Sequence, residues 1–150
     1  YNDNGEPEDL TGWNIAKGKT SVAGHYPNEN RRPSLANDGK IEDGDSRWTS
    51  DGAKHYAAEG ENAEDWWYVD LGDFYSIETI KILFETASPT DYDLLISNNA
   101  LTWTVIGTYT EAPNTGNSAE NYNVYEFSDK VGRYVKIFAR NGYSNLAYGF

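Results

Sequence analysis

Apolar residues alternate with polar ones through four separate stretches of the chain, and this period of two constrains the fold more than any other feature. Successive side chains of a strand point to opposite sides, so each stretch places its apolar residues on one face. The four sets are Trp67, Val69 and Leu71; Ile80, Ile82 and Phe84; Tyr92, Leu94 and Ile96; and Val135, Ile137 and Ala139. No apolar stripe of useful length follows the helical period of about 3.6 residues. The sequence therefore predicts an all-β fold, an antiparallel β-sandwich.

Turn-forming clusters separate these stretches and indicate how the chain is organised. The clusters are Thr86–Asp91, Ser97–Ala100 and Glu111–Asn121. The only segment with helical character, Ala57–Asp65, is interrupted by Gly60. Residues 1–12 are acidic, contain Gly and Pro and have almost no aliphatic residues, which is typical of a linker or an N-terminal segment. We therefore expect one domain, residues 13–150.

The charge of the chain excludes several classes of partner. Twelve Lys and Arg against 24 Asp and Glu give a formal net charge of -12. A nucleic acid or an anionic lipid surface would be repelled, so neither is expected as a partner. The longest purely apolar run, Ile82–Phe84, is far shorter than the roughly 20 residues of a membrane-spanning helix. The chain has no Met and begins at Tyr1, which predicts a processed or excised segment.

Seven short motifs follow one another from Asn14 to Phe150. They are "NIAKGK" (14–19), "LANDG" (35–39), "SRWTS" (46–50), "WWYVDLG" (66–72), "YDLLISNNALTW" (92–103), "GRYVKIFA" (132–139) and "AYGF" (147–150). Together they resemble the discoidin family, also called coagulation factor V/VIII C-type domains. The resemblance is closest to its bacterial branch, the family 32 carbohydrate-binding modules. It implies an eight-stranded jelly-roll sandwich. Family members continue past the "YGF" position into a last strand that carries a Glu, so we expect residues 13–150 to lack the last few C-terminal residues of such a module.

The acidic stretch Asn37–Ser50 has two interpretations. Its two Asp-Gly pairs are typical of plain turns, and its spacing does not fit an EF-hand, because Asp43 stands where that loop needs Gly. The family resemblance instead implies one structural calcium ion, held mostly by backbone carbonyls. The implied ligands are the carbonyls of Leu35, Lys40 and Ser46, the Ser46 hydroxyl and the Asp38 carboxylate, with Asp43 and Asp45 as local alternatives. Both interpretations remain open at this point.

Three loops are candidates for a ligand site. Sugars are bound by an aromatic ring that stacks on their C–H face and by planar polar groups that bond their hydroxyls. The resembling modules bind sugar through loops at the end of the sandwich that also carries the calcium. Here these loops are Gly24–Arg32, Asp51–Ala57 and Arg140–Asn145, and the expected sugar-binding residues are Tyr26, His55, Arg140, Asn141 and Tyr143. The resemblance favours galactose or N-acetylgalactosamine, and the acidic surface disfavours uronic and sialic acids.

The sequence gives no support for catalysis. Neither His lies in a metalloprotease motif, no G-x-S-x-G motif occurs, and no Cys is present to act as a nucleophile. We therefore expect a monomeric, secreted or cell-surface accessory module of a carbohydrate-active protein. The alternatives are a protein-binding adhesion domain and a structural spacer. We expect three tryptophans to pack in the core: Trp48, Trp67 and Trp103. We expect Asp70 and Arg133, two polar groups at strand ends, to have a structural role.

Overall fold

The structure is a computed structural model that describes residues 12–40, 46–50, 64–85, 88–112 and 122–142. Residues 141 and 142 are described by their backbone only. The described residues form seven strands and two short 3-10 helices. The elements in chain order are β1 (Thr20–Ala23), η1 (Glu29–Arg31), η2 (Pro33–Leu35), β2 (Asp65–Ser76), β3 (Thr79–Ile82), β4 (Pro89–Ser97), β5 (Thr104–Tyr109), β6 (Asn123–Glu126) and β7 (Val131–Gly142). The described part contains no helix that is long and apolar enough to cross a membrane.

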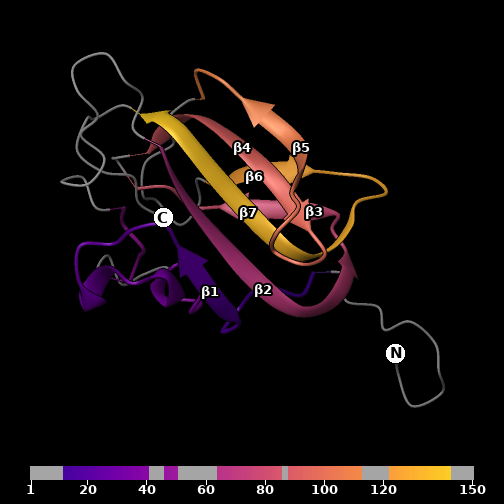
Figure 1. Cartoon of the computed structure of the whole chain (residues 1–150), viewed down its shortest axis with the longest axis horizontal. Coiled ribbons are helices and arrows are strands. Elements are labelled where there is room, and N and C mark those ends of the chain that lie inside the picture. Colours follow the sequence, from indigo (N-terminus) through magenta and orange to yellow (C-terminus); the bar gives the residue numbers. More distant parts are fainter. Residues whose placement is uncertain (1–11, 41–45, 51–63, 86–87, 113–121, 143–150) are drawn as a thin grey trace.

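The strands form two antiparallel sheets. The larger sheet has the order β1-β2-β7-β4-β5, and the smaller one pairs β3 with β6. Figure 1 shows β3 and β6 behind the larger sheet, with the long strands β2, β4 and β7 crossing in front of them. The predicted antiparallel β-sandwich is confirmed. The eight-strand count concerns the whole chain, and seven strands fall within the described residues.

The core lies between the two sheets and is built from the four alternating sets. Every residue of these sets is buried or packs against a buried cluster, as the period of two predicts. One cluster contains Trp48 and Trp67, so the expectation that these two indoles pack in the core is confirmed. The other cluster surrounds Tyr92, which has no exposed surface. The short strands β1, β5 and β6 were not predicted from the sequence.

Trp103 does not lie in the core, and this corrects the expectation from the sequence. Its ring contacts Tyr68 and Tyr134, whose neighbours Val69 and Val135 face inward. Trp103 therefore lies on the outer face of the larger sheet. The Lys136 ammonium sits 4.7 Å from the centre of the Trp103 ring and 4.8 Å from that of Trp66. Burial lowers the pKa of Lys136, because desolvation disfavours its charged form.

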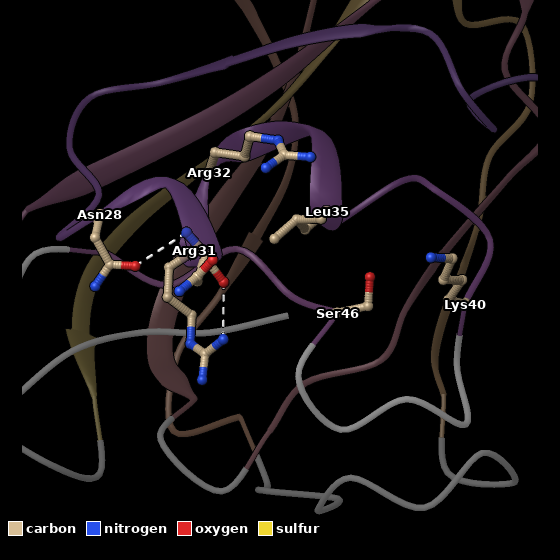
Figure 2. A pocket seen from close by; sticks show the side chains of 7 residues that line it. Asn28, Arg31, Arg32, Leu35, Lys40 and Ser46 are labelled. Carbon is tan, nitrogen blue, oxygen red and sulfur yellow. Dashed lines mark hydrogen bonds between the residues drawn. The ribbon is translucent and has the colours of Figure 1, made fainter.

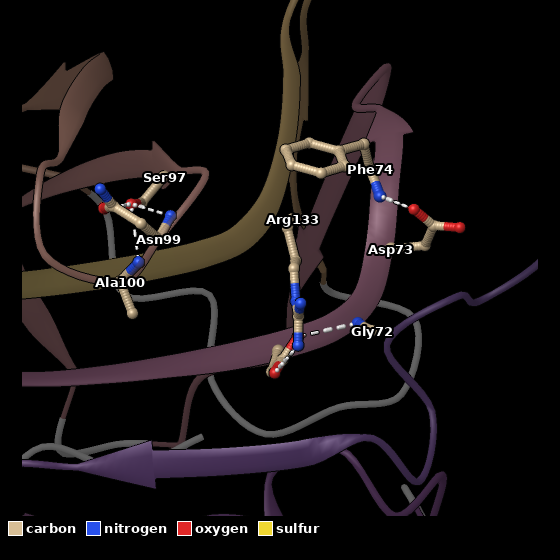
Figure 3. Close-up of polar contacts among 8 residues, drawn as sticks. Gly72, Asp73, Phe74, Ser97, Asn99, Ala100 and Arg133 are labelled. Carbon is tan, nitrogen blue, oxygen red and sulfur yellow. Dashed lines mark hydrogen bonds and ion pairs between the residues drawn. The ribbon is translucent and has the colours of Figure 1, made fainter.

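An ion pair and a tight turn close the end of the sandwich where β2 finishes and β7 begins (Figure 3). Arg133 donates two hydrogen bonds to Asp70, 2.8 Å from Nε to Oδ1 and 2.9 Å from Nη2 to Oδ2. These bonds hold the pKa of Asp70 below its ordinary value. In the neighbouring turn, Ser97 Oγ accepts from the amide of Ala100 at 3.0 Å. The structural role expected for Asp70 and Arg133 is confirmed.

Candidate functional site

The loop end of the sandwich is the end at which β1, β5 and β7 finish and β2, β4 and β6 begin (Figure 1). The strand register fixes this arrangement, because Asp65 pairs with Ala139 and Pro89 pairs with Gly142. Residues far apart in the sequence therefore meet there. The loop after β1, which carries η1 and η2, lies at this end.

Buried groups anchor the loop that follows β1. The Trp48 indole N–H donates to the carbonyl of His25, and the Trp67 indole N–H donates to the carbonyl of Pro33, each at 3.0 Å. The amide of Gly24 donates to the carbonyl of Trp66 at 2.9 Å. A buried indole needs a hydrogen-bond partner, so each tryptophan both fills the core and fixes a point of the loop.

A close backbone approach explains the glycine at the start of this loop. A Cβ atom on Gly24 would lie 2.3 Å from Oδ1 of Asp65, which no side chain could tolerate. Asp65 is buried, and its Oδ1 accepts from the amide of Trp66 at 2.8 Å. Nδ1 of His25 lies 3.7 Å from the same oxygen. The Asp65 carboxylate thus ties the loop to the first residues of β2.

A hollow of about 480 Å³ opens beside η1 and η2, and we call it the basic hollow. Its described lining residues are Asn28, Asn30, Arg31, Arg32, Leu35, Lys40 and Ser46. Figure 2 shows them arriving from the two short helices and from the loop beyond. Three of these side chains are cationic, which contrasts with the formal charge of -12 of the whole chain. Cationic side chains therefore gather at this hollow on a protein that is acidic as a whole.

Hydrogen bonds hold the two arginines of the basic hollow close to the backbone. Arg31 Nη1 donates to the carbonyl of Asn30 at 2.8 Å, and Arg32 Nη1 donates to the carbonyl of Glu29 at 3.1 Å. Arg32 Nε donates to Oγ of Ser34 at 3.0 Å. A guanidinium carries five N–H donors, so the two bonds that Arg32 makes do not use all of its donors. Both arginines belong to the loop Gly24–Arg32 that was expected to bind sugar, but neither was among the predicted sugar-binding residues.

The expected sugar-binding residues come only partly within the described chain. Tyr26 lies in the anchored loop with 37% of its surface exposed. Arg140, on β7, forms an ion pair with Asp93 of β4. Asn141 occupies the strand β7 opposite Asp91. His55 and Tyr143 lie outside the described residues. The assignment of these five residues to sugar binding remains a prediction.

The expected calcium ligands lie close together where the structure describes them. Leu35, Lys40 and Ser46 all line the basic hollow. The Asp38 carboxylate accepts from the Lys40 amide at 2.9 Å and also binds the Ser46 hydroxyl. Asp43 and Asp45 lie outside the described residues. The chemistry of the described set fits calcium, which prefers carboxylate, hydroxyl and carbonyl oxygens.

Buried Asn37 sets the position of the loop that carries these expected ligands. Its Nδ2 donates to the carbonyls of Ala16 and Lys19, at 2.7 and 2.9 Å, while its Oδ1 accepts from the Ser21 hydroxyl. Within the described part of the chain, no group of three or more His, Cys, Asp or Glu side chains could hold a metal. A calcium ion here would therefore depend on backbone carbonyls for most of its ligands.

The family of the chain follows from comparison with known domains. Residues 35–137 match the F5/F8 type C family described as the NedA-like, galactose-binding domain. The match covers more than half of the chain, so the chain belongs to this family. The expected relationship to coagulation factor V/VIII C-type domains is thereby confirmed. No curated protein matches the chain.

Solved structures of carbohydrate-binding modules share the fold. Chitosan-binding module 1, derived from a chitosanase/glucanase of Paenibacillus sp. IK-5, has a TM-score of 0.73 and 22% identity, covering 90% of this chain and 92% of that chain. CpGH89CBM32-5 from Clostridium perfringens, solved with GalNAc-β-1,3-galactose, has a TM-score of 0.67 and 17% identity, covering 87% and 94%. The lectin domain of Lectinolysin, solved with Lewis B antigen, has a TM-score of 0.66 and 20% identity, covering 91% and 90%. The chain thus has the fold of carbohydrate-binding modules.

Proposed function

We propose that the protein is a non-catalytic module that tethers a glycan-active protein to terminal sugars, with galactose or N-acetylgalactosamine favoured. The chain belongs to a galactose-binding family, and its loop end is anchored by hydrogen bonds from Trp48 and Trp67. This observation carries the proposal. A rigid loop loses little entropy when it binds a ligand, because its backbone is already fixed. Accessory modules named among the similar structures derive from glycan-active enzymes, which supports the tethering role.

The proposed sugar site combines a stacking ring with bidentate donors. Tyr26 comes two residues before the lining residue Asn28 and has 37% of its surface exposed, and Arg31 and Arg32 of the basic hollow carry planar groups suited to adjacent hydroxyls. Tyr143 and His55 would complete the site from the two other loops. An open site of this kind buries little area, so we expect dissociation constants in the range of about 1 µM to 1 mM.

We also propose that a calcium ion stabilises the loop between η2 and Trp48. Asp38, Ser46 and the carbonyls of Leu35 and Lys40 would hold the ion, together with Asp43. The ion would fix the loop that borders the basic hollow without contacting the sugar. We propose that the protein acts outside the cell or on its surface, and that it acts there as a monomer.

A glycan array tests the proposal directly. The full chain should bind glycans that end in galactose or N-acetylgalactosamine, and calorimetry should then give the affinity. Tyr26→Ala and Tyr143→Ala should each weaken binding by roughly fivefold, because a stacked ring contributes about 1 kcal/mol. Phe74→Ala is the matched control, since Phe74 is an aromatic residue with 55% exposure at the opposite end of the sandwich. Absence of binding to every glycan on the array would refute the proposed function.

A further inference from the structure

A second hollow, also of about 480 Å³, lies at the edge of the sandwich between β5 and β6. Its described lining residues are Thr108, Tyr109, Thr110, Glu111, Ala112, Asn123, Val124 and Tyr125. β5 is the edge strand of the larger sheet and β6 belongs to the smaller one, so the hollow joins the two sheets. We call it the tyrosine hollow. It shares no described lining residue with the basic hollow.

The floor of the tyrosine hollow is aromatic and rigid. The rings of Tyr109 and Tyr125 are in contact, with 4.3 Å between their centres and 47° between their planes. The Tyr125 hydroxyl bonds the hydroxyl of Tyr92, which is fully buried, and accepts from Asn123 Nδ2 at 3.2 Å. Burial, together with Tyr125, raises the pKa of Tyr109, so its hydroxyl stays protonated. The floor is therefore made of tyrosine rings that a ring contact and a hydroxyl bond tie to each other and to the core.

One residue on the rim is held in an unusual backbone conformation. Glu111 has a φ of 51°, in the left-handed region that non-glycine residues seldom occupy. Its amide donates to Asp91 Oδ1 at 3.0 Å, and the next amide, that of Ala112, donates to the carbonyl of Thr90 at 2.9 Å. Both bonds tie the segment to the start of β4. Strain that is retained by such bonds concentrates at binding sites, and here the bonds fix the backbone from which the exposed Glu111 side chain projects.

The charge of the tyrosine hollow is opposite to that of the basic hollow. Glu111 is the one charged side chain among its described lining residues, whereas the basic hollow has three cationic ones. A pyranose ring with a protonated amino group matches this lining: its C–H face fits the tyrosine rings and its ammonium group fits the carboxylate. The net charge of -12 favours the same cationic ligand at longer range.

We propose that the tyrosine hollow is a second saccharide site that selects amine-bearing sugars over their N-acetylated and acidic counterparts. The proposal takes from the proposed function only that the ligand is a saccharide, and it does not require the loop-end site. Tyr109 and Tyr125 provide the stacking surface and Glu111 provides the selectivity for the amine. Thr108 and Thr110 add hydroxyl groups along the rim.

The test is a titration of the isotope-labelled full chain with chitotriose, the trimer of glucosamine, followed by NMR. Backbone amides of residues 108–112 and 123–125 should shift, and tri-N-acetylchitotriose should bind more weakly. Glu111→Gln should weaken chitotriose binding by about two- to fivefold, the range of an exposed ion pair. Glu126→Gln is the matched control, because Glu126 is an exposed carboxylate on β6 outside the lining. It should leave the affinity unchanged.

Three results would overturn the proposal: shifts confined to other residues, equal affinity for the two trimers, or equal effects of the two Gln variants. Galactosides titrated into the same sample report on the loop end separately, because they should shift amides of residues 24–32. If galactosides cause no shifts but chitotriose does, the proposed function is contradicted and the proposal for the tyrosine hollow stands. If chitotriose causes no shifts but galactosides do, the proposal for the tyrosine hollow is contradicted and the proposed function stands.

Discussion

Trp67→Phe tests whether the buried indoles hold the binding loop in place. Trp67 belongs to the core and donates its N–H to the carbonyl of Pro33 at 3.0 Å. The phenyl ring keeps most of the packing but cannot donate this hydrogen bond, whose net contribution is about 1 kcal/mol. The smaller ring also buries roughly 40 Å² less apolar area, which adds about 1 kcal/mol. The expected loss of stability is therefore about 2 kcal/mol.

Two measurements on this variant separate loop release from general destabilisation. Thermal unfolding should show a Tm lowered by about 4–8 °C, the shift expected for a domain of this size. Calorimetry with a galactoside should show weaker binding, because Pro33 begins η2 and η2 borders the basic hollow. Ile82→Ala is the control: Ile82 is buried in the other core cluster, and its loss costs about 2–5 kcal/mol. If both variants keep or lose affinity to the same extent, the anchoring role of Trp67 is refuted.

Three further predictions concern pH, metal and backbone strain. Arg133 lowers the pKa of Asp70 below 3.8, so the pair stabilises the fold above that pH, and the stabilisation is lost as pH falls through the lowered pKa. In acid unfolding, Asp70→Asn should therefore make the free energy of unfolding depend less steeply on pH. A slope equal to that of the wild type would contradict the pairing. Calcium should raise the Tm and Asp38→Ala should abolish the increase, whereas a melting curve insensitive to chelator would exclude the site. Glu111→Gly should stabilise the protein by about 0.5–1 kcal/mol in denaturant unfolding, because Gly adopts the φ of 51° without strain; a loss of stability would show that Glu111 is not strained.

The loop-end residues show how far a family resemblance reaches. It placed four expected calcium ligands near one another: Leu35, Asp38, Lys40 and Ser46. In the structure, Leu35, Lys40 and Ser46 line the basic hollow. The Asp38 carboxylate bonds the Lys40 amide and the Ser46 hydroxyl. It did not indicate that Arg140 would pair with Asp93, because those residues are 47 positions apart and meet only when β4 and β7 pair. Side-chain partners across strands depend on register, which a single sequence does not show.

The tyrosine hollow could not be found from the sequence for the same reason. Tyr109 ends a strand that was not predicted, and Tyr125 lies in the four-residue strand β6. Strands this short carry too little alternation to be recognised. Their side chains meet because the two sheets pack face to face around a shared core, and no local pattern encodes that contact.

The sequence by itself determined the strands that form the core and the side of each that faces inward. Alternation is a property of neighbouring residues, so Trp67, Leu94 and Ile137 could be assigned to the interior before any strand was paired. The tertiary structure decided the strand order, the outer position of Trp103 and the opposite charges of the two hollows. These features depend on contacts between distant segments, and such contacts are fixed only when the sheets form and pack together.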